Sequence, residues 1–526
     1  MATQGYFALV LHAHLPFVRH PEHPEFLEEG WFYEAINETY IPLLTAFERL
    51  ANDGVDFRVT LNMSPPLCEM LADPLLQGRY LRHLDRIEHL AGREAAAWPE
   101  DNPIGKLARM YCDRFRACRE RFEAAGRNLL TGFRTLQDDG FIEIITCGAT
   151  HGMLPLMRTE EAIRAQVEVA AANYRKHFGR EARGIWLPEC AYRSGVEDFL
   201  HRAGIRFFFT DAHAVMYGSP RPKYGVFRPA YCGAGVAAFA RDIESSRQVW
   251  SRQQGYPGDV EYREFYRDVG HDGEQHYIGP YLPAGIRTNL GLKYYKITGD
   301  VELHQKEYYD PDVARERAAE HAGNFMFNRQ AQIKHLRSFL GVEPIVVSPY
   351  DAELFGHWWY EGPTFLEFLF RKIHHDQDEI GTVTPSEFLE RHATHQKLRP
   401  TASTWGDRGY FEVWLNGTND WIYRHLHKAE ERMVELARRF PEAGGVAERA
   451  LKQAARELLL AQSSDWAFIM TTGTMTAYAE RRTREHVQRF TRLYEMVVSG
   501  QIDEGWLADV ESKDTIFQEI DYRVYR

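Results

Sequence analysis

The chain has 526 residues, a formal net charge of −12 and an aromatic content of 13%. Its length exceeds what one small core needs and predicts two or three domains, or one large barrel with additions. Its negative charge and lack of a basic block argue against nucleic acid as a partner, because such proteins gain affinity from clustered Lys and Arg.

Short apolar runs alternate with helical stretches along most of the chain. Seven runs predict buried strands, and each ends at a polar residue. These end residues are His12, Asn62, His151, Glu189, Asp211, Asp351 and Thr384. Helical periodicity lies between the runs, as over residues 24–53, 158–179 and 310–341. The alternation predicts an α/β fold with a parallel sheet, and in a barrel the functional residues lie at the carboxyl ends of the strands.

Two segments interrupt the alternation. Residues 67–135 are helical and predict a helical insertion. Residues 218–295 are rich in Gly, Pro and Tyr, and a long irregular stretch with this aromatic content favours a functional lid. The end of the chain is helical, so we expect a catalytic barrel over 1–400 and a helical domain over 401–526.

Two carboxylates follow predicted strands in aromatic surroundings, Glu189 in WLPEC and Asp351 in SPYDAELFGHWW. Two acids at the mouth of one barrel can cleave a glycosidic bond, one attacking the sugar and the other donating a proton. The alternative is that each is an ordinary loop carboxylate.

Histidines also lie at strand ends, namely His12, His14, His151 and His213. Residues i and i+2 of a strand share a face, so His12 and His14 could hold zinc in a hydrolase. The alternatives are hydrogen bonding to sugar hydroxyls, orientation of a carboxylate, or a satisfied core histidine. Spacing favours a core or orienting role over a metal site.

Tryptophans gather after Asp351 and near residue 410. Trp358, Trp359, Trp405 and Trp414 could stack on pyranose rings, or could pack between the barrel and the helical domain.

Three further residues are candidates for substrate binding. Asp465 could bind a sugar hydroxyl or cap a helix, and Arg263 could pair with a carboxylate or form a surface salt bridge. Gly279 lies between aromatic flanks, where the backbone could approach a ligand.

Five ordered blocks carry a family resemblance: HAHLP, GATHG, WLPEC, SPYDAELFGHWW and AQSSDWAFIM. On these blocks the chain resembles glycoside hydrolase family 57 over nearly its full length, and most closely the branching members. The resemblance implies a distorted (β/α)7 barrel with a helical insertion and a C-terminal all-helical domain. It implies Glu189 as the nucleophile, Asp351 as the acid/base, and His12 and His151 around the cleaved bond.

The same resemblance places Arg263, Trp405 and Asp465 at positions similar to glucan-contacting ones, with Gly279 as a looser match. It implies no metal and no other cofactor. The reaction it implies is the 1,4-α-glucan branching reaction, in which a retaining double displacement transfers a cut chain to a 6-hydroxyl. The irregular segment 218–262 would act as a lid that shields the intermediate from water, through its aromatic side chains Tyr231, Trp250 and Tyr256.

Other functions stay open at this point. Within the family these are an α-glucan hydrolase and a 4-α-glucanotransferase, and outside it a metal-dependent hydrolase using His12 and His14, or a glucan-binding protein without catalysis. The partners expected are α-glucan donors and acceptors. Scattered cysteines, no signal peptide and no long apolar stretch predict a cytoplasmic protein without a membrane partner, as a monomer or small homo-oligomer.

Overall fold

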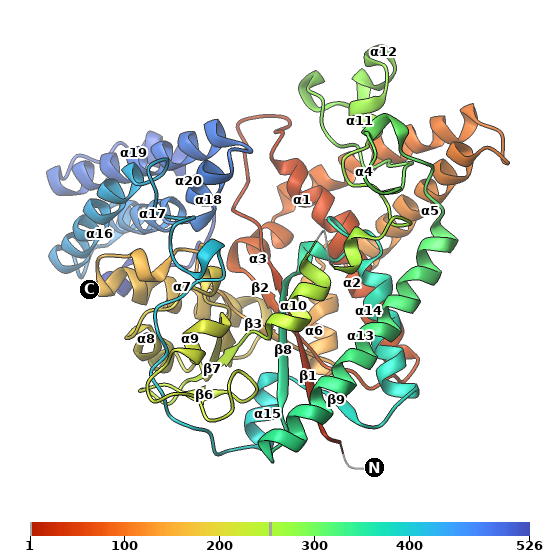
Figure 1. Cartoon of the computed structure of the whole chain (residues 1–526). Helices are drawn as coiled ribbons and strands as arrows, with labels where there is room; N and C mark the ends of the chain where they lie inside the picture. The colour runs from red at the N-terminus through yellow and green to blue at the C-terminus, as the bar shows by residue number, and fades with distance from the viewer. Residues whose placement is uncertain (1–2, 252–254) are drawn as a thin grey trace.

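The computed structural model describes residues 3–251 and 255–526, and places a core of strands between layers of helices (Figure 1). The first sheet is parallel, in the order β3 (Ile142–Ile145), β2 (Val59–Met63), β1 (Gly5–Ala13) and β8 (Ile345–Asp351), with β9 (Ile380–Thr382) paired to the start of β1. The second sheet is β4 (Gly184–Ile185), β5 (Phe207–Thr210), β7 (Ala237–Ala240) and β6 (Ala230–Tyr231), of which only β6 is antiparallel. The predicted α/β class with a parallel sheet is confirmed.

The two sheets are joined at two points. Thr146, just after β3, forms a parallel bridge with Ile185 of β4. The backbone N–H of Asp242, just after β7, donates to the carbonyl of Val347 in β8 at 2.8 Å. Both faces of the strands are buried, which is why the runs read as continuously apolar rather than alternating.

The alternating side chains of the strands enter two separate cores. Tyr6, Ala8 and Val10 of β1 belong to an inner cluster with apolar side chains of β3, β5, β7 and β8. The intervening side chains of β1 pack outward, against the helices, in a larger core.

All seven predicted strands are present. The expectation that residues 218–295 have no regular structure is wrong at β7. This strand pairs in parallel with β5 along its whole length. Its sequence AAFA has weak strand propensity and follows a glycine-rich turn, so its apolar pattern was too short to be recognised.

Helices cover the strands where the periodicity predicted them. Residues 24–53 form α1 (Glu29–Ala35), a π-helical turn (Ile36–Tyr40) and α2 (Ile41–Asn52). The helices α7 (Glu160–Phe178) and α13 (Pro311–Leu340) are followed by glycines, Gly179 and Gly341, at φ 68° and 71°. Glycine adopts this left-handed conformation without steric cost, and it ends both helices.

The predicted insertion consists of four helices, of which α4 and α5 pair along their length at the upper right of Figure 1. They are α3 (Pro65–Ala72), α4 (Pro74–Ala97), α5 (Pro103–Ala124) and α6 (Leu130–Asp138).

The C-terminal helices form a layer beside α7, at the upper left of Figure 1. They are α16 (Trp421–Arg439), α17 (Gly445–Ala461), α18 (Ser464–Thr472), α19 (Thr476–Ser499) and α20 (Glu504–Lys513). The division into domains at residue 400 stays a prediction. Within the described ranges, no helix has the length and apolar character needed to cross a membrane.

Candidate active site

The carboxyl ends of three neighbouring strands bring polar side chains to one level. His12 on β1 is the register partner of Asn62 on β2 and of Asp351 on β8. Because the strands are parallel, all three side chains lie at the same edge of the sheet, as the sequence predicted.

This edge opens into a cleft of about 560 Å³. Predicted residues lining it are His12, His14, His151, Glu189, Asp351, Trp250, Trp358, Trp405, Trp414 and Asp465. The cleft therefore unites both candidate catalytic acids with four histidine and carboxylate neighbours and a set of tryptophans.

Glu189 lies in a short turn, Pro188–Cys190, with φ 60° and ψ 25°. A left-handed conformation is strained for glutamate, and such strain gathers at functional sites. The side chain accepts hydrogen bonds from Trp405 Nε1 at 2.8 Å and from the Ser464 hydroxyl at 3.2 Å, so both oxygens are fixed. Burial raises the pKa of Glu189 to about 7, and these two donors and the charge of His14 oppose the rise.

Asp351 has a different electrostatic environment. Burial, then the carboxylates of Glu353 and Glu189, raise the pKa of Asp351 well above its ordinary value. Glu353 accepts hydrogen bonds from Tyr40 Oη at 2.5 Å and from the backbone N–H of His14 at 3.2 Å. These influences all favour the protonated form of Asp351 over its carboxylate.

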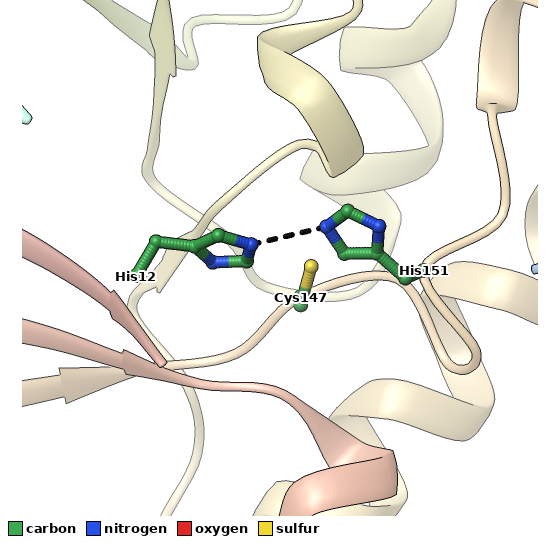
Figure 2. A group of neighbouring side chains, drawn as sticks. All are labelled: His12, Cys147 and His151. Atoms are coloured by element: carbon green, nitrogen blue, oxygen red, sulfur yellow. Dashed lines mark hydrogen bonds between the residues drawn. The ribbon is translucent and has the colours of Figure 1, made fainter. Parts of the chain in front are cut away.

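Two imidazoles meet in the floor of the cleft. The His12 and His151 rings approach Nε2 to Nε2 at 3.1 Å (Figure 2). The His12 ring also stacks on buried Trp186, with centroids 4.6 Å apart. Burial lowers the pKa of both histidines, so the neutral rings are favoured.

His14 forms an ion pair with Asp465 from α18, at 3.0 Å from Nε2. Burial is the largest single effect and disfavours charge on both side chains. The charge and hydrogen bond of Asp465, with the charges of Glu353 and Glu189, together outweigh it and raise the pKa of His14, and the charge and hydrogen bond of His14, with the Ser463 hydroxyl, lower the pKa of Asp465. Among the described residues, no cluster of three metal-binding side chains contains both His12 and His14. The geometry thus gives no support to the metal hydrolase built on that pair.

Three predicted substrate-binding residues are absent from the lining of the cleft. Arg263 is buried, and its guanidinium lies 3.0 Å from Glu38 and over the Tyr360 ring. Gly279 begins a short turn that packs near α4. Trp359 is buried in the core, and its neighbour Trp358, 55% exposed, faces the cleft instead.

The predicted lid contributes one of its three named aromatics. Trp250, at the end of α10 (Ile243–Trp250), lines the cleft. Tyr231 belongs to β6, and Tyr256 donates a hydrogen bond to Asn324 of α13. Residues 252–254 of this region lie outside the described residues.

Three residues of the site were not predicted. Ser464 bonds both Glu189 and His151, and Glu353 faces Asp351. Ser464 directly precedes Asp465 in the motif SSDW, and Glu353 follows Asp351 by two residues in the motif DAE. This closeness to predicted residues is the sequence signal that could have identified them. Arg241 was missed with β7, because it directly follows that strand.

Paired carboxylates at strand ends, in a cleft walled by tryptophans, define a glycoside-cleaving enzyme. Residues 8–399 match the sequence profile of glycosyl hydrolase family 57, and residues 425–525 match the C-terminal region of 1,4-alpha-glucan branching enzyme. The chain belongs to glycosyl hydrolase family 57.

Individual relatives match this chain over nearly its whole length. The 1,4-alpha-glucan branching enzyme TK1436 of Thermococcus kodakarensis is 37% identical, over 98% of this chain and 78% of that protein. Its crystal structure superposes with a TM-score of 0.90 and covers 99% of this chain and 96% of the other. The structure of the alpha-amylase AmyC from Thermotoga maritima has a TM-score of 0.93 at 46% identity and covers 99% of both chains.

Proposed function

We propose that this chain is a 1,4-α-glucan branching enzyme that acts by a retaining double displacement, with Glu189 as nucleophile and Asp351 as acid/base. The observation that carries the roles is the contrast between the two acids in one cleft. Glu189 is held by two hydrogen-bond donors, which favour its anion, whereas Asp351 faces two other carboxylates, which favour its protonated form.

In the first half-reaction Asp351 donates its proton to the glycosidic oxygen as Glu189 attacks the anomeric carbon. The C–O bond to the leaving chain breaks, and a glucosyl ester forms on Glu189. In the second half-reaction the Asp351 carboxylate removes the proton of a glucan 6-hydroxyl, which displaces Glu189 and closes an α-1,6 bond. Two inversions retain the configuration.

The cleft-lining residues are proposed to hold the α-glucan. His12 and His151 are positioned for hydroxyls around the cleaved bond, and the His14–Asp465 pair offers a further acceptor. Trp405 and Trp414 supply aromatic walls, and Trp358 joins them in place of Trp359. Cytoplasmic location and a monomeric or small homo-oligomeric state stay predictions.

We also propose that the two sheets are one distorted (β/α)7 barrel made of β1, β2, β3, β4, β5, β7 and β8. Three observations support this. The Thr146–Ile185 bridge joins the end of β3 to β4, and the Asp242–Val347 hydrogen bond joins the end of β7 to β8. A single inner cluster contains side chains from strands of both sheets, as the interior of a closed barrel requires.

An α-glucan hydrolase is the second candidate, because AmyC is 46% identical. The branching candidate is favoured by the TK1436 relationship and by the match of residues 425–525 to the branching-enzyme C-terminal region. The two candidates share the first half-reaction and differ in whether water or a 6-hydroxyl accepts the chain.

Product analysis on linear amylose tests the proposal. We expect new α-1,6 linkages to exceed new reducing ends, activity to survive a chelator, and Glu189→Gln to lose turnover by about 10³-fold or more while still binding amylose. The surface variant Glu442→Gln serves as control. Reducing ends without α-1,6 linkages would assign the hydrolase, and full activity of Glu189→Gln would reject the nucleophile.

A further inference from the structure

The tautomer of His12 is fixed by its neighbour on β2. The Asn62 amide nitrogen donates to the carbonyls of Ile145 and Thr146, at 3.2 and 2.7 Å, so its oxygen must face His12. His12 Nδ1 lies 2.5 Å from that oxygen and therefore carries hydrogen. In the neutral ring, Nε2 then holds a lone pair.

The tautomer of His151 is set by its own neighbour, Ser464 of α18. The Ser464 hydroxyl donates to Glu189, so its oxygen accepts from His151 Nδ1 at 2.8 Å when Glu189 is ionised. The Nε2 of His151 then also holds a lone pair.

While Glu189 is ionised, two nitrogen lone pairs thus point at each other across 3.1 Å. A neutral pair cannot form a hydrogen bond in this arrangement, and a cation between the rings would relieve the repulsion. An imidazolium is disfavoured because the two residues are only 3% and 2% exposed.

A third donor completes the arrangement. Cys147, which follows β3, carries a free thiol, and its sulfur lies with one ring nitrogen of each histidine in a group whose members are all within 4.8 Å of one another. Figure 2 shows the sulfur reaching toward the gap between the two rings. A tetrahedral ion with Zn–N bonds of 2.0–2.1 Å separates two nitrogens by about 3.3 Å, close to the observed spacing.

The surroundings also match those of metal-binding histidines. Such rings usually donate their other N–H to a fixed acceptor, as His12 does to Asn62 and His151 to Ser464. His12 and His151 both line the cleft, so a fourth ligand position would open toward it.

We propose that His12, His151 and Cys147 bind one thiophilic cation, such as Zn²⁺, Cu⁺ or Cd²⁺, and that occupancy inhibits the enzyme. Imidazole and thiolate donors favour these ions over Mg²⁺ and Ca²⁺. Binding converts the Cys147 thiol to a thiolate and releases its proton. Inhibition would follow because the ion withdraws both imidazoles from the glucan; this consequence, unlike binding, rests on the proposed function.

Cadmium titration of the full chain tests the site directly. One equivalent of Cd²⁺ should produce an ultraviolet thiolate-to-metal charge-transfer band that excess Mg²⁺ does not displace. Cys147→Ser should lose the band. Cys118→Ser, a substitution of a buried thiol in α5, should keep it. Absence of the band in the unsubstituted chain, or its survival in Cys147→Ser, would overturn the proposal.

Inhibition is measured on the same proteins, each relative to its own metal-free activity. Cys147→Ala, a second substitution in case the serine variant fails to fold, should need about tenfold more Cd²⁺ for half-inhibition. Unchanged inhibition in that variant would overturn the inhibitory role. A normal band in a chain that shows no glucan activity even without metal would support the site and reject the proposed function.

Discussion

His12 on β1 and Asp351 on β8 are register partners at the carboxyl ends of adjacent parallel strands. This pairing places an imidazole and an acid side by side without any contribution from loop geometry. Asn62 on β2 extends the same row, so three strands alone fix one wall of the site. Glu189 reaches the cleft differently, from a strained turn that Trp405 and Ser464 hold in place.

The pH profile of branching should be bell-shaped, with limbs that belong to the Glu189–Asp351 pair. Activity rises as pH increases through about 7, where Glu189 ionises, and falls at higher pH, where Asp351 loses its proton. In Glu353→Gln one carboxylate near Asp351 is gone, so the pKa of Asp351 falls and the alkaline limb shifts to lower pH. The measurement is kcat/KM for α-1,6 linkage formation across pH, with Glu442→Gln as control. An alkaline limb that does not move would reject Asp351 as the group with the higher pKa.

The raised pKa of Glu189 also makes this residue costly for stability. Between pH 4.5 and about 7 the folded chain retains a proton that the unfolded chain has released, so the free energy of unfolding falls as pH rises through this window. Glu189→Gln cannot ionise and should be more stable than the unsubstituted chain by roughly 1–3 kcal/mol above pH 7, with little difference below pH 4.5. Thermal unfolding at pH 4 and pH 8 checks this, with Glu442→Gln expected to show no such pH dependence. Equal gains at both pH values would contradict it.

The strand ends of the site could be predicted because a chemically capable residue terminates each apolar run. His12, Glu189 and Asp351 all satisfy this pattern, and parallel pairing brings such ends together. Trp359 could not be told from Trp358, because the two are identical neighbours in one segment and only the fold decides which is buried. The prediction that Arg263 contacts substrate is not supported for a related reason. Its buried partner Glu38 lies 225 residues earlier in the chain, so the sequence does not reveal their pairing.

Arg263 should matter for stability rather than for substrate. Its guanidinium pairs with buried Glu38 and stacks over Tyr360 at 3.9 Å. In Arg263→Ala the Glu38 carboxylate loses its main counter-charge, so we expect the free energy of unfolding to fall by about 3–5 kcal/mol. The KM for amylose should change by less than about twofold.

Denaturant unfolding and steady-state kinetics on the same preparation separate these two outcomes. Arg438→Ala is the matched control, because the Arg438 side chain is 62% exposed in its ion pair with Glu161. An Arg263→Ala protein of normal stability with a raised KM would instead make this residue a glucan contact.

Trp250 should influence which acceptor takes the chain. Its ring, 51% exposed at the end of α10, lies 6.0 Å from that of Trp405, whose N–H is bonded to Glu189. An apolar ring so near the proposed nucleophile would exclude water from the glucosyl ester, while a glucan acceptor could stack on it. Trp250→Ala should therefore lower the ratio of new α-1,6 linkages to new reducing ends by about threefold or more, with a smaller effect on total cleavage.

Tyr217→Ala, which removes an aromatic side chain that is 60% exposed and does not line the cleft, should leave the ratio unchanged. Cleavage and transfer falling together in Trp250→Ala would show that the ring only binds the donor, and would remove it from the control of water.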